Sequence, residues 1–422
     1  MTGHRRRRRR RKTGIRRKNG CALALVFVVI LCAGAAAGIP WAVETFGGEV
    51  TEAFHENVEK AVHVLETETA AEPETAVPET EVSGGFYYQQ LDEEDRLIYR
   101  EMLCGLREME ETIRLDAGRD DLPEEIYEAV LYDRPELFWC LGSCQMTVYR
   151  DYTEFYPAYV CSEEERESRQ KEIDASVEAC LSDISSEASE YDRIRAVFEY
   201  LVNTVDYDED APDNQNIYSA LVGKRSVCAG YSRAVQYLLE RLGIECIYVV
   251  GTAQNQEAHA WNIVKCDGAY YHVDATFGDP VFLGAESGED IPSDIIYYDY
   301  LCCTDQEIRK DHTPADDFTY PACVSDDLNY YRMDGTYFDS YDPQTILNAM
   351  NESIAAGNDT FTCKFASEEI YAQARDGLTD GLFPEAARTV AQLYGMDQVK
   401  YTYMEDAAHC KMVVFWNYQQ QL

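Results

Sequence analysis

The stretch "EAHAWNIVKCDGAYYHVDATFGDP", residues 257–280, predicts a β-hairpin. Apolar and polar side chains alternate on both sides of residues 267–268, an Asp-Gly pair typical of a two-residue hairpin turn. In that register Trp261 faces Asp274, and His259 is a diagonal neighbour of Asp274 on the same face. The hairpin is therefore expected to bring an imidazole within hydrogen-bonding reach of a carboxylate.

A second stretch, "KRSVCAGYSRAVQ" at 224–236, places Cys228 at the expected start of an amphipathic helix. Ser226 is a good N-cap residue, and Gly243 stands where a helix-ending glycine belongs. Gly230 in the first turn allows a close approach to the helix. One face of the helix is apolar and consists of Ala234, Val235, Leu238, Leu239 and Leu242. The unpaired N–H groups and the dipole at a helix start favour negative charge on a thiol there. Taken alone, this stretch favours an inert helix-start cysteine.

The two stretches together contain the parts of an activated nucleophile. A thiol needs a base, and a base is held in orientation by a third group, here in the chain order Cys228, His259, Asp274. His272 lies on the same face nearer the turn and is the alternative base, although a packed strand histidine is its simpler interpretation. Trp261 either shields the ion pair or fills the core.

These residues resemble the transglutaminase-like superfamily of papain-like cysteine hydrolases and acyltransferases. The helix-start Cys228, the His259 of "HAWN" and the Asp274 of "VDAT" match its three motifs. The resemblance covers roughly 190–285 and extends more weakly over 90–340. It implies an α+β fold: a helix bearing the cysteine packs on an antiparallel sheet bearing the histidine and aspartate, with flanking α/β segments.

The resemblance also implies a mechanism. His259 would take the proton of Cys228, whose sulfur would attack a carboxamide or peptide carbonyl to give a thioester. Water or an amine would then take the acyl group. The backbone N–H of Cys228 would hold the oxyanion, with help from Asn216 or Tyr218, and Gly230 and Trp261 would lie near the substrate.

No cofactor or metal is expected. The calcium segments of animal transglutaminases and the paired zinc motifs of the N-glycanase branch are not found in the sequence. The acidic runs 208–213 and 286–294 are either calcium ligands or, as the simpler interpretation, solvated loops.

The charge distribution is strongly asymmetric. Of the 37 Lys and Arg residues, 11 lie in residues 1–18, which leaves 26 against 77 acidic residues in the remainder. An ectodomain this acidic repels nucleic acid, so no nucleic acid partner is expected. Residues 19–43 are uncharged and long enough for a bilayer span, and the basic residues before them predict a cytoplasmic N-terminus. A cleaved signal peptide, with secretion, is the alternative.

Thirteen of the fifteen cysteines follow this apolar segment. Disulfides are allowed outside the cytoplasm, and an odd number leaves at least one free thiol. Twelve could therefore pair and leave Cys228 alone. Cys140 and Cys144 are expected to lie across a turn, close enough to bridge, with zinc as a rival interpretation. Cys246 and Cys266 are expected to be structural.

The sequence divides into six regions. They are a basic cytoplasmic tail (1–18), a transmembrane helix or signal peptide (19–43), a stalk and disordered Glu/Thr/Pro linker (44–85), an N-terminal α+β region (86–185), a transglutaminase-like catalytic core (186–315) and a C-terminal α/β domain (316–422). Strands are expected at 145–160, 360–365, 399–404 and 411–417, and helices at 162–184, 191–205, 343–357 and 367–392.

Three functions compete at this point. The first is a membrane-anchored cysteine peptidase or acyltransferase that acts on proteins or peptides of the cell surface or cell wall. The second is a binding module on the same fold with an inert triad. The third is a disulfide-stabilised surface domain. The oligomeric state has no signal in the sequence.

Overall fold

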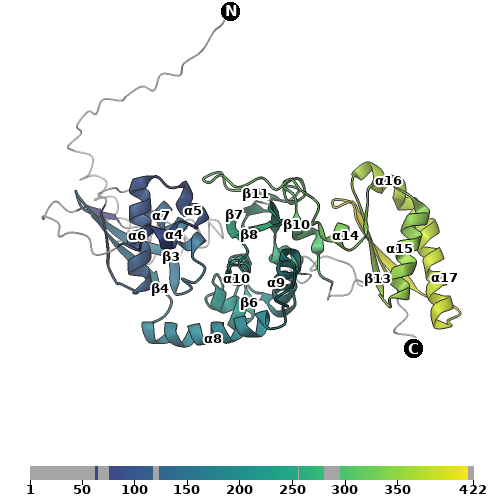
Figure 1. The fold of residues 1–422 in the computed structure, drawn as a ribbon, viewed down its shortest axis with the longest axis horizontal. Helices are drawn as coiled ribbons and strands as arrows, with labels where there is room; N and C mark the ends of the chain where they lie inside the picture. Colours follow the sequence, from purple (N-terminus) through teal and green to yellow (C-terminus); the bar gives the residue numbers. More distant parts are fainter. Residues whose placement is uncertain (1–61, 65–75, 117–122, 255, 280–294, 417–422) are drawn as a thin grey trace, which may run out of the picture. The chain divides into compact units, whose positions relative to one another are not determined.

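The computed structural model describes residues 62–64, 76–116, 123–254, 256–279 and 295–416 (Figure 1). The basic tail and the expected transmembrane helix, residues 1–43, lie outside the described residues. Within the described ranges we find no helix with both the length and the apolar character that a bilayer span requires.

A five-stranded sheet in the strand order β10-β9-β8-β7-β11 forms the centre of the molecule. Its strands are β7 (Cys246–Ala253), β8 (Glu257–Cys266), β9 (Ala269–Val273), β10 (Leu301–Cys303) and β11 (His312–Pro314). All neighbouring pairs are antiparallel. The sheet is the antiparallel one that the resemblance implies.

The expected hairpin is confirmed in its register. Asn262 pairs with Val273 and Cys266 pairs with Ala269. Asp267 and Gly268 have φ values of 49° and 84°. Both central residues therefore lie in the left-handed region, as a type I′ turn requires, and its twist matches that of the strands.

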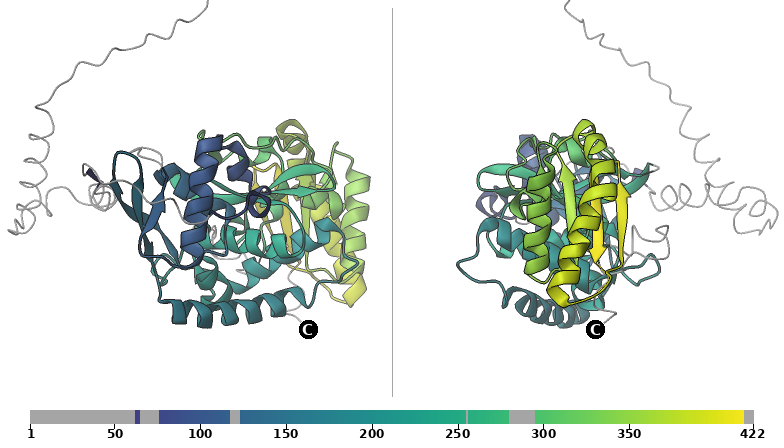
Figure 2. Two further views of the ribbon diagram at one scale, coloured as in Figure 1. Left: turned by 60° about the vertical axis from the view of Figure 1, so that its left-hand side comes forward. Right: turned by 90° about the vertical axis from the view of Figure 1, so that its right-hand side faces the viewer.

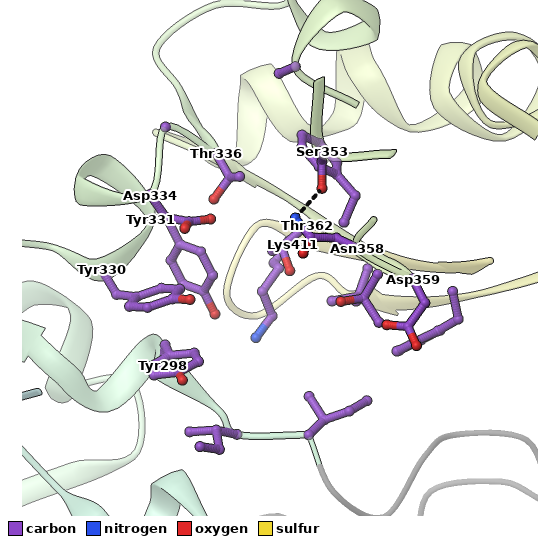
Figure 3. Close-up of a pocket in the computed structure, with 18 of the residues that line it drawn as sticks. Tyr298, Tyr330, Tyr331, Asp334, Thr336, Ser353, Asn358, Asp359, Thr362 and Lys411 are labelled. Atoms are coloured by element: carbon purple, nitrogen blue, oxygen red, sulfur yellow. Dashed lines mark hydrogen bonds between the residues drawn. The ribbon is translucent and has the colours of Figure 1, made fainter. Parts of the chain in front are cut away.

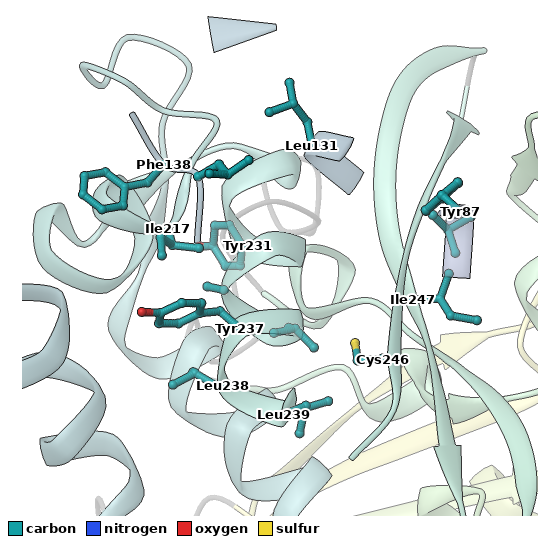
Figure 4. Packing of buried hydrophobic residues seen from close by; sticks show 14 of the residues in the cluster. Tyr87, Leu131, Phe138, Ile217, Tyr231, Tyr237, Leu238, Leu239, Cys246 and Ile247 are labelled. Atoms are coloured by element: carbon teal, nitrogen blue, oxygen red, sulfur yellow. The ribbon is translucent and has the colours of Figure 1, made fainter. Parts of the chain in front are cut away.

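Helix α10 (Cys228–Arg241) packs on strands β7 and β8 through its apolar face. Figure 4 shows Leu238 and Leu239 of this helix in one cluster with Cys246 and Ile247 of β7. The helix ends as expected: Gly243 has φ 75° and its N–H donates to the carbonyl of Glu240.

The start of α10 differs from the expectation. Val227 occupies the N-cap position without a side-chain cap, so the prediction of Ser226 as N-cap is wrong. The Ser226 hydroxyl instead donates to the carbonyl of Asn214, at 2.6 Å, and lies 2.7 Å from the Ser219 hydroxyl. Ser226 is therefore used to hold the preceding loop rather than the helix.

Further elements surround the central sheet and helix. They are α9 (Glu190–Thr204), β5 (Asp206–Tyr207), η1 (Ser219–Gly223), β6 (Arg225–Ser226), α11 (Ala275–Gly278), η3 (Tyr298–Tyr300), α13 (Asp305–Ile308) and α14 (Tyr330–Met333). Ser189 caps α9 and its expected apolar face, including Ile194, Phe198 and Leu201, is buried.

The N-terminal region contains a second sheet, with strand order β1-β3-β4-β2, and several helices. Its elements are β1 (Val62–Val64), α4 (Glu79–Val82), α5 (Phe86–Gln90), α6 (Glu93–Arg107), β2 (Ile113–Leu115), α7 (Pro123–Asp133), β3 (Cys140–Val148), β4 (Thr153–Tyr159) and α8 (Glu163–Leu181). The two strands expected at 145–160 are confirmed. Buried side chains of this region join those of the central sheet in one continuous core.

The expected linker ends earlier than Gly85. Val77 and Val82 are buried, and α4 lies within the range predicted to be disordered. The Glu/Thr/Pro composition is typical of a solvated spacer, but two valines in it reach the core.

The C-terminal region has its own hydrophobic core. Its sheet has the strand order β12-β13-β15-β14, formed by β12 (Tyr337–Phe338), β13 (Thr360–Phe365), β14 (Tyr401–Asp406) and β15 (Lys411–Trp416). The helices are α15 (Pro343–Ala355), α16 (Glu368–Gly377), η4 (Leu378–Leu382) and α17 (Phe383–Tyr394). Figure 2 shows α15 and α17 against one face of this sheet.

A buried ion cluster connects this sheet with the segment that precedes β10. Lys364 on β13 and Lys411 on β15 both contact the carboxylate of Asp299, and Lys364 Nζ lies 3.1 Å from Asp299 Oδ1. Burial opposes a charged carboxylate, but the two lysines hold the pKa of Asp299 well below its usual range. The cluster is thus ionised, and Glu307 and Asp406 also lie against the two lysines, at 3.7 and 3.5 Å.

All thirteen cysteines after residue 43 lie in the described ranges, and none of them forms a disulfide there. The pairing of twelve cysteines that an odd count allows is therefore not found in these ranges. Cys140 and Cys144 both belong to β3, where the register with β4 shifts between them, so they do not face each other across a turn. Cys246 and Cys266 are buried strand residues, as expected of structural cysteines.

Candidate active site

Three side chains from different elements meet beside the start of α10. The hairpin directs His259 of β8 towards Asp274, which follows β9, and the imidazole Nε2 lies 2.7 Å from Asp274 Oδ2. The thiol of Cys228 lies close enough to the same imidazole to contribute to its raised pKa. Because Nε2 faces the carboxylate, Nδ1 is the ring nitrogen that remains for the thiol. The structure thus brings the three predicted residues together in the predicted order.

Two polar side chains fix α10 against β8 at this point. The Ser232 hydroxyl, one turn after Cys228, lies 2.9 Å from the Cys228 carbonyl and 2.8 Å from the Ala260 carbonyl. The buried amide of Asn262 donates to the Ser232 carbonyl at 3.0 Å. Ala260 is next to His259, so these bonds set the spacing between the thiol and the imidazole.

The carboxylate of Asp274 is fully buried. Its Oδ1 accepts the backbone N–H groups of Thr276 and Phe277, at 2.8 and 3.2 Å, and so caps α11. Burial alone would raise its pKa, but the charge and hydrogen bond of His259, with those of His312, hold the pKa well below its usual range. Asp274 is therefore ionised at neutral pH.

The imidazole of His259 is buried, which disfavours its charged form. The Asp274 carboxylate and its hydrogen bond act in the opposite direction, and Cys228 adds to them. Together they raise the pKa of His259 to about 10. An imidazolium that stays charged at neutral pH beside a thiol is what a cysteine nucleophile requires.

Trp261 and His272 form a supporting pair. The Trp261 Nε1–H donates to His272 Nδ1 at 3.0 Å, and His272 Nε2 lies 3.0 Å from Asp305 Oδ1. The Trp261 ring lies parallel to that of His259, with 6.1 Å between centroids. Burial lowers the pKa of His272, so the ring is neutral and its tautomer is fixed by these partners. His272 therefore supports Trp261 rather than acting as the alternative base.

The other predicted site residues have structural partners. The Asn216 amide donates to the Phe138 carbonyl at 3.1 Å, and its Oδ1 accepts the Tyr218 N–H at 2.9 Å. The Tyr218 hydroxyl donates to Glu172 at 3.0 Å. Neither side chain is brought to the thiol by these contacts. A Cβ on Gly230 would lie 1.9 Å from Ser226 Oγ, so the close approach is that of the chain's own preceding loop.

Two tyrosines that the sequence did not single out lie near the thiol. Burial raises the pKa of Tyr207, and charge on Cys228 contributes. Burial also raises the pKa of Tyr248 to about 12. Arg233 acts to lower this pKa, and Cys228 acts to raise it. Tyr207 of β5 pairs with Ser226 of β6, two residues before Cys228. No local pattern indicated them, because both reach the site through pairing of distant segments.

Two cavities formed by the described residues lie elsewhere. Figure 3 shows the larger, of about 890 Å³, with Tyr298, Tyr330, Thr336 and Lys411 around it. Neither cavity is lined by Cys228, His259 or Asp274. The candidate site therefore rests on the geometry of its side chains and not on these cavities.

Three groups of described residues bring possible metal ligands within 4.8 Å of one another. They are His259, Asp274 and His312; His272, Asp305 and Cys323; and Glu190, Cys266 and Asp267. The ion pairs and hydrogen bonds of the histidines account for the first two groups without a metal. In the acidic run 208–213, Asp208 pairs with Arg225 and Asp213 pairs with Arg169. The run 286–294 lies outside the described residues.

Comparison with known proteins finds one matching family model and several similar proteins. Residues 178–275 match the family model of the Transglutaminase-like superfamily. A stretch of 115 residues is 27% identical to the kyphoscoliosis peptidase of Mus musculus and makes up 23% of this chain but only 17% of that protein. A solved structure of a TGase is 14% identical, has a TM-score of 0.25, and covers 43% of this chain and 53% of its own. A proposed cysteine protease from Cytophaga hutchinsonii is 18% identical, has a TM-score of 0.24, and covers 31% and 53%.

Proposed function

This chain belongs to the transglutaminase-like superfamily, and on that premise we propose that it is a cysteine peptidase or acyltransferase with Cys228 as its nucleophile. The observation that carries the proposal is the hydrogen bond between His259 and Asp274 beside the thiol of Cys228. Each member has the partner that its role requires, and the imidazole is held charged. The name of the similar mouse protein, a peptidase, agrees with this class of reaction.

The chemistry follows from these roles. The Cys228 sulfur attacks the carbonyl carbon of an amide, and the carbon–oxygen double bond becomes a single bond to an oxyanion. His259 then gives its proton to the departing nitrogen, the carbon–nitrogen bond breaks, and a thioester remains on Cys228. Water, or a primary amine, next loses a proton to His259 and attacks the thioester, which releases the acid or a new amide and restores the thiol.

The oxyanion has donors available at the start of α10. The first N–H groups of a helix have no intrahelical acceptors, and Cys228 is the first residue of this helix. Donors preorganised where charge develops contribute strongly to acyl transfer. We assign this role to the backbone of the first turn, since the side chains of Asn216 and Tyr218 are engaged elsewhere.

The substrate and its location are part of the proposal. We expect a protein or peptide amide at the cell surface or cell wall, because the uncharged segment 19–43 after the basic residues 1–18 is typical of a membrane anchor or signal peptide. Separating membranes from soluble protein, with washes at high pH, tests the anchor. A chain that stays in the cytosol would contradict this part alone.

The reaction is tested by trapping the acyl group. We would incubate the protein with a peptide mixture from cell-surface extract, quench in acid and map adducts by mass spectrometry. The expected result is an acyl adduct on Cys228 that hydroxylamine removes as a hydroxamate. Cys228→Ala should lose the product, whereas the matched control Cys161→Ala, a half-buried cysteine outside the site, should keep it. Equal product from Cys228→Ala would exclude Cys228 as the nucleophile.

A further inference from the structure

Asp274 accepts hydrogen bonds from a second imidazole that the three-residue mechanism does not use. His312 Nε2 lies 3.0 Å from Asp274 Oδ2, the same oxygen that His259 Nε2 reaches at 2.7 Å. The other oxygen accepts two backbone N–H groups. One oxygen of the buried carboxylate therefore caps α11, and the other accepts hydrogen bonds from two histidines.

His312 is held on both sides. Its Nδ1 lies 2.5 Å from Asp311 Oδ1, and Asp311 Oδ2 accepts the Tyr300 hydroxyl at 2.6 Å. Strand β11 places the ring, because His312 pairs with Ala253 at the edge of the central sheet. Phe277 and Trp261 pack against the ring, with centroids 4.5 and 5.1 Å away. The buried imidazole has no room to turn away from Asp274.

This placement determines the charge of His312. An ionised carboxylate oxygen can accept a hydrogen bond but cannot donate one. Because both ring nitrogens of His312 face carboxylates, both must carry protons. Burial opposes the charged form, but the hydrogen bonds to Asp274 and Asp311 raise the pKa of His312. The other titratable groups around it are His259, with ring centroids 5.1 Å apart, the neutral His272 and the hydroxyl of Tyr300.

A second cation has a use in the proposed cycle. His259 becomes neutral each time it gives its proton to a leaving group, and Asp274 would then be a buried carboxylate without a counter-ion. Such a group is strongly destabilised and tends to take up a proton, after which it no longer holds the imidazole. A permanent imidazolium on the same oxygen removes that difficulty.

We propose that His312, supported by Asp311, is a positioning residue that keeps the Asp274 carboxylate ionised and aimed at His259 throughout the reaction. This proposal rests on the proposed function of the same site. It adds a second histidine–aspartate pair to the constellation, so that the order of contacts is Cys228, His259, Asp274, His312, Asp311.

The test is the pH profile of iodoacetamide alkylation at Cys228, read by peptide mapping, in His312→Gln and Asp311→Asn. Glutamine can still donate a hydrogen bond to Asp274 but carries no charge. We expect the acid limb of the His312→Gln profile to move upward by about one pH unit, with about fivefold slower alkylation at the midpoint of the unaltered limb. Asp311→Asn should shift the limb in the same direction by less. His409→Gln, which alters a histidine–aspartate pair of the C-terminal region, should leave the profile unchanged.

The outcomes separate the two claims. Ordinary, slow alkylation of Cys228 in the unaltered protein would contradict the proposed function itself. If Cys228 is alkylated fast in the unaltered protein, and the pH profiles of His312→Gln and Asp311→Asn coincide with its profile, only the role of His312 is overturned. If His312→Gln does not fold, Asp311→Asn decides the matter. A stoichiometric transition metal in the purified protein, lost from His312→Gln, would also overturn the proposal, since the cluster would then be a metal site.

Discussion

Replacing Asp274 by asparagine removes the charge that holds His259 but keeps an oxygen that can cap α11. Raising the pKa of a histidine from 6.5 to about 10, as for His259, corresponds to about 5 kcal/mol of preference for the imidazolium. Asp274 is the main source of this preference, with a share from Cys228. We therefore expect Asp274→Asn to reduce turnover by about 10²–10⁴-fold, the range of losses typical of a wrongly oriented or uncharged base. Alkylation of Cys228 at pH 6 should fall in parallel.

The assay compares alkylation rates between pH 4 and pH 10 by mass spectrometry of the Cys228 peptide. Asp279→Asn is the matched control, because Asp279 is also buried and accepts the Tyr231 hydroxyl at 2.9 Å, five residues further along the chain. It should lower stability without slowing alkylation of a folded protein. An Asp274→Asn protein that folds and alkylates at the unaltered rate at pH 6 would refute the reasoning.

Three further predictions concern stability. Asn262→Ala should lower the free energy of unfolding by about 1–3 kcal/mol in urea titration, because the Ser232 carbonyl loses its donor. It should also slow Cys228 alkylation, and an unchanged rate would show that this bond does not set the site. Asp299→Asn should cost about 3–5 kcal/mol, since two buried lysines lose the carboxylate that they share and keep only Glu307 and Asp406, and a change below about 1 kcal/mol would contradict an ionised cluster. The pKa values of Asp274 and Asp299 are lower in the folded chain than in the unfolded one. Their contribution to the free energy of unfolding is therefore present above about pH 4 and is lost as the pH falls below it. Urea midpoints that stay constant from pH 6 to pH 3 would be inconsistent with these shifts.

The parts of the site that the sequence predicted are those fixed by local geometry. A two-residue turn at Asp267–Gly268 determines which residues of the hairpin face each other, and this alone brings His259 to Asp274. The apolar face of the helix and its terminating Gly243 determine the length of α10. The exact start of the helix was missed because the Ser226 hydroxyl finds acceptors in a loop that the local pattern does not show.

The parts that could not be predicted depend on contacts between distant segments. His312 lies 38 residues after Asp274 and reaches it only because β11 pairs with β7. The one signal in the sequence is the Asp-His pair that closes "YLCCTDQEIRKDH" (300–312), and it does not indicate a partner. Parity of the cysteines allowed bridges that the described residues do not form, since pairing depends on distances that only the tertiary structure defines.

The imidazole of His259, whose pKa is raised beside Cys228, distinguishes this thiol from twelve other cysteines in the described residues. The most direct test is a competition among them: one brief exposure of the native protein to substoichiometric iodoacetamide at pH 6, followed by site-resolved mass spectrometry. The account predicts that Cys228 carries nearly all of the label and that His259→Ala abolishes this preference. Label spread evenly over the accessible cysteines, or concentrated on another one, would contradict it.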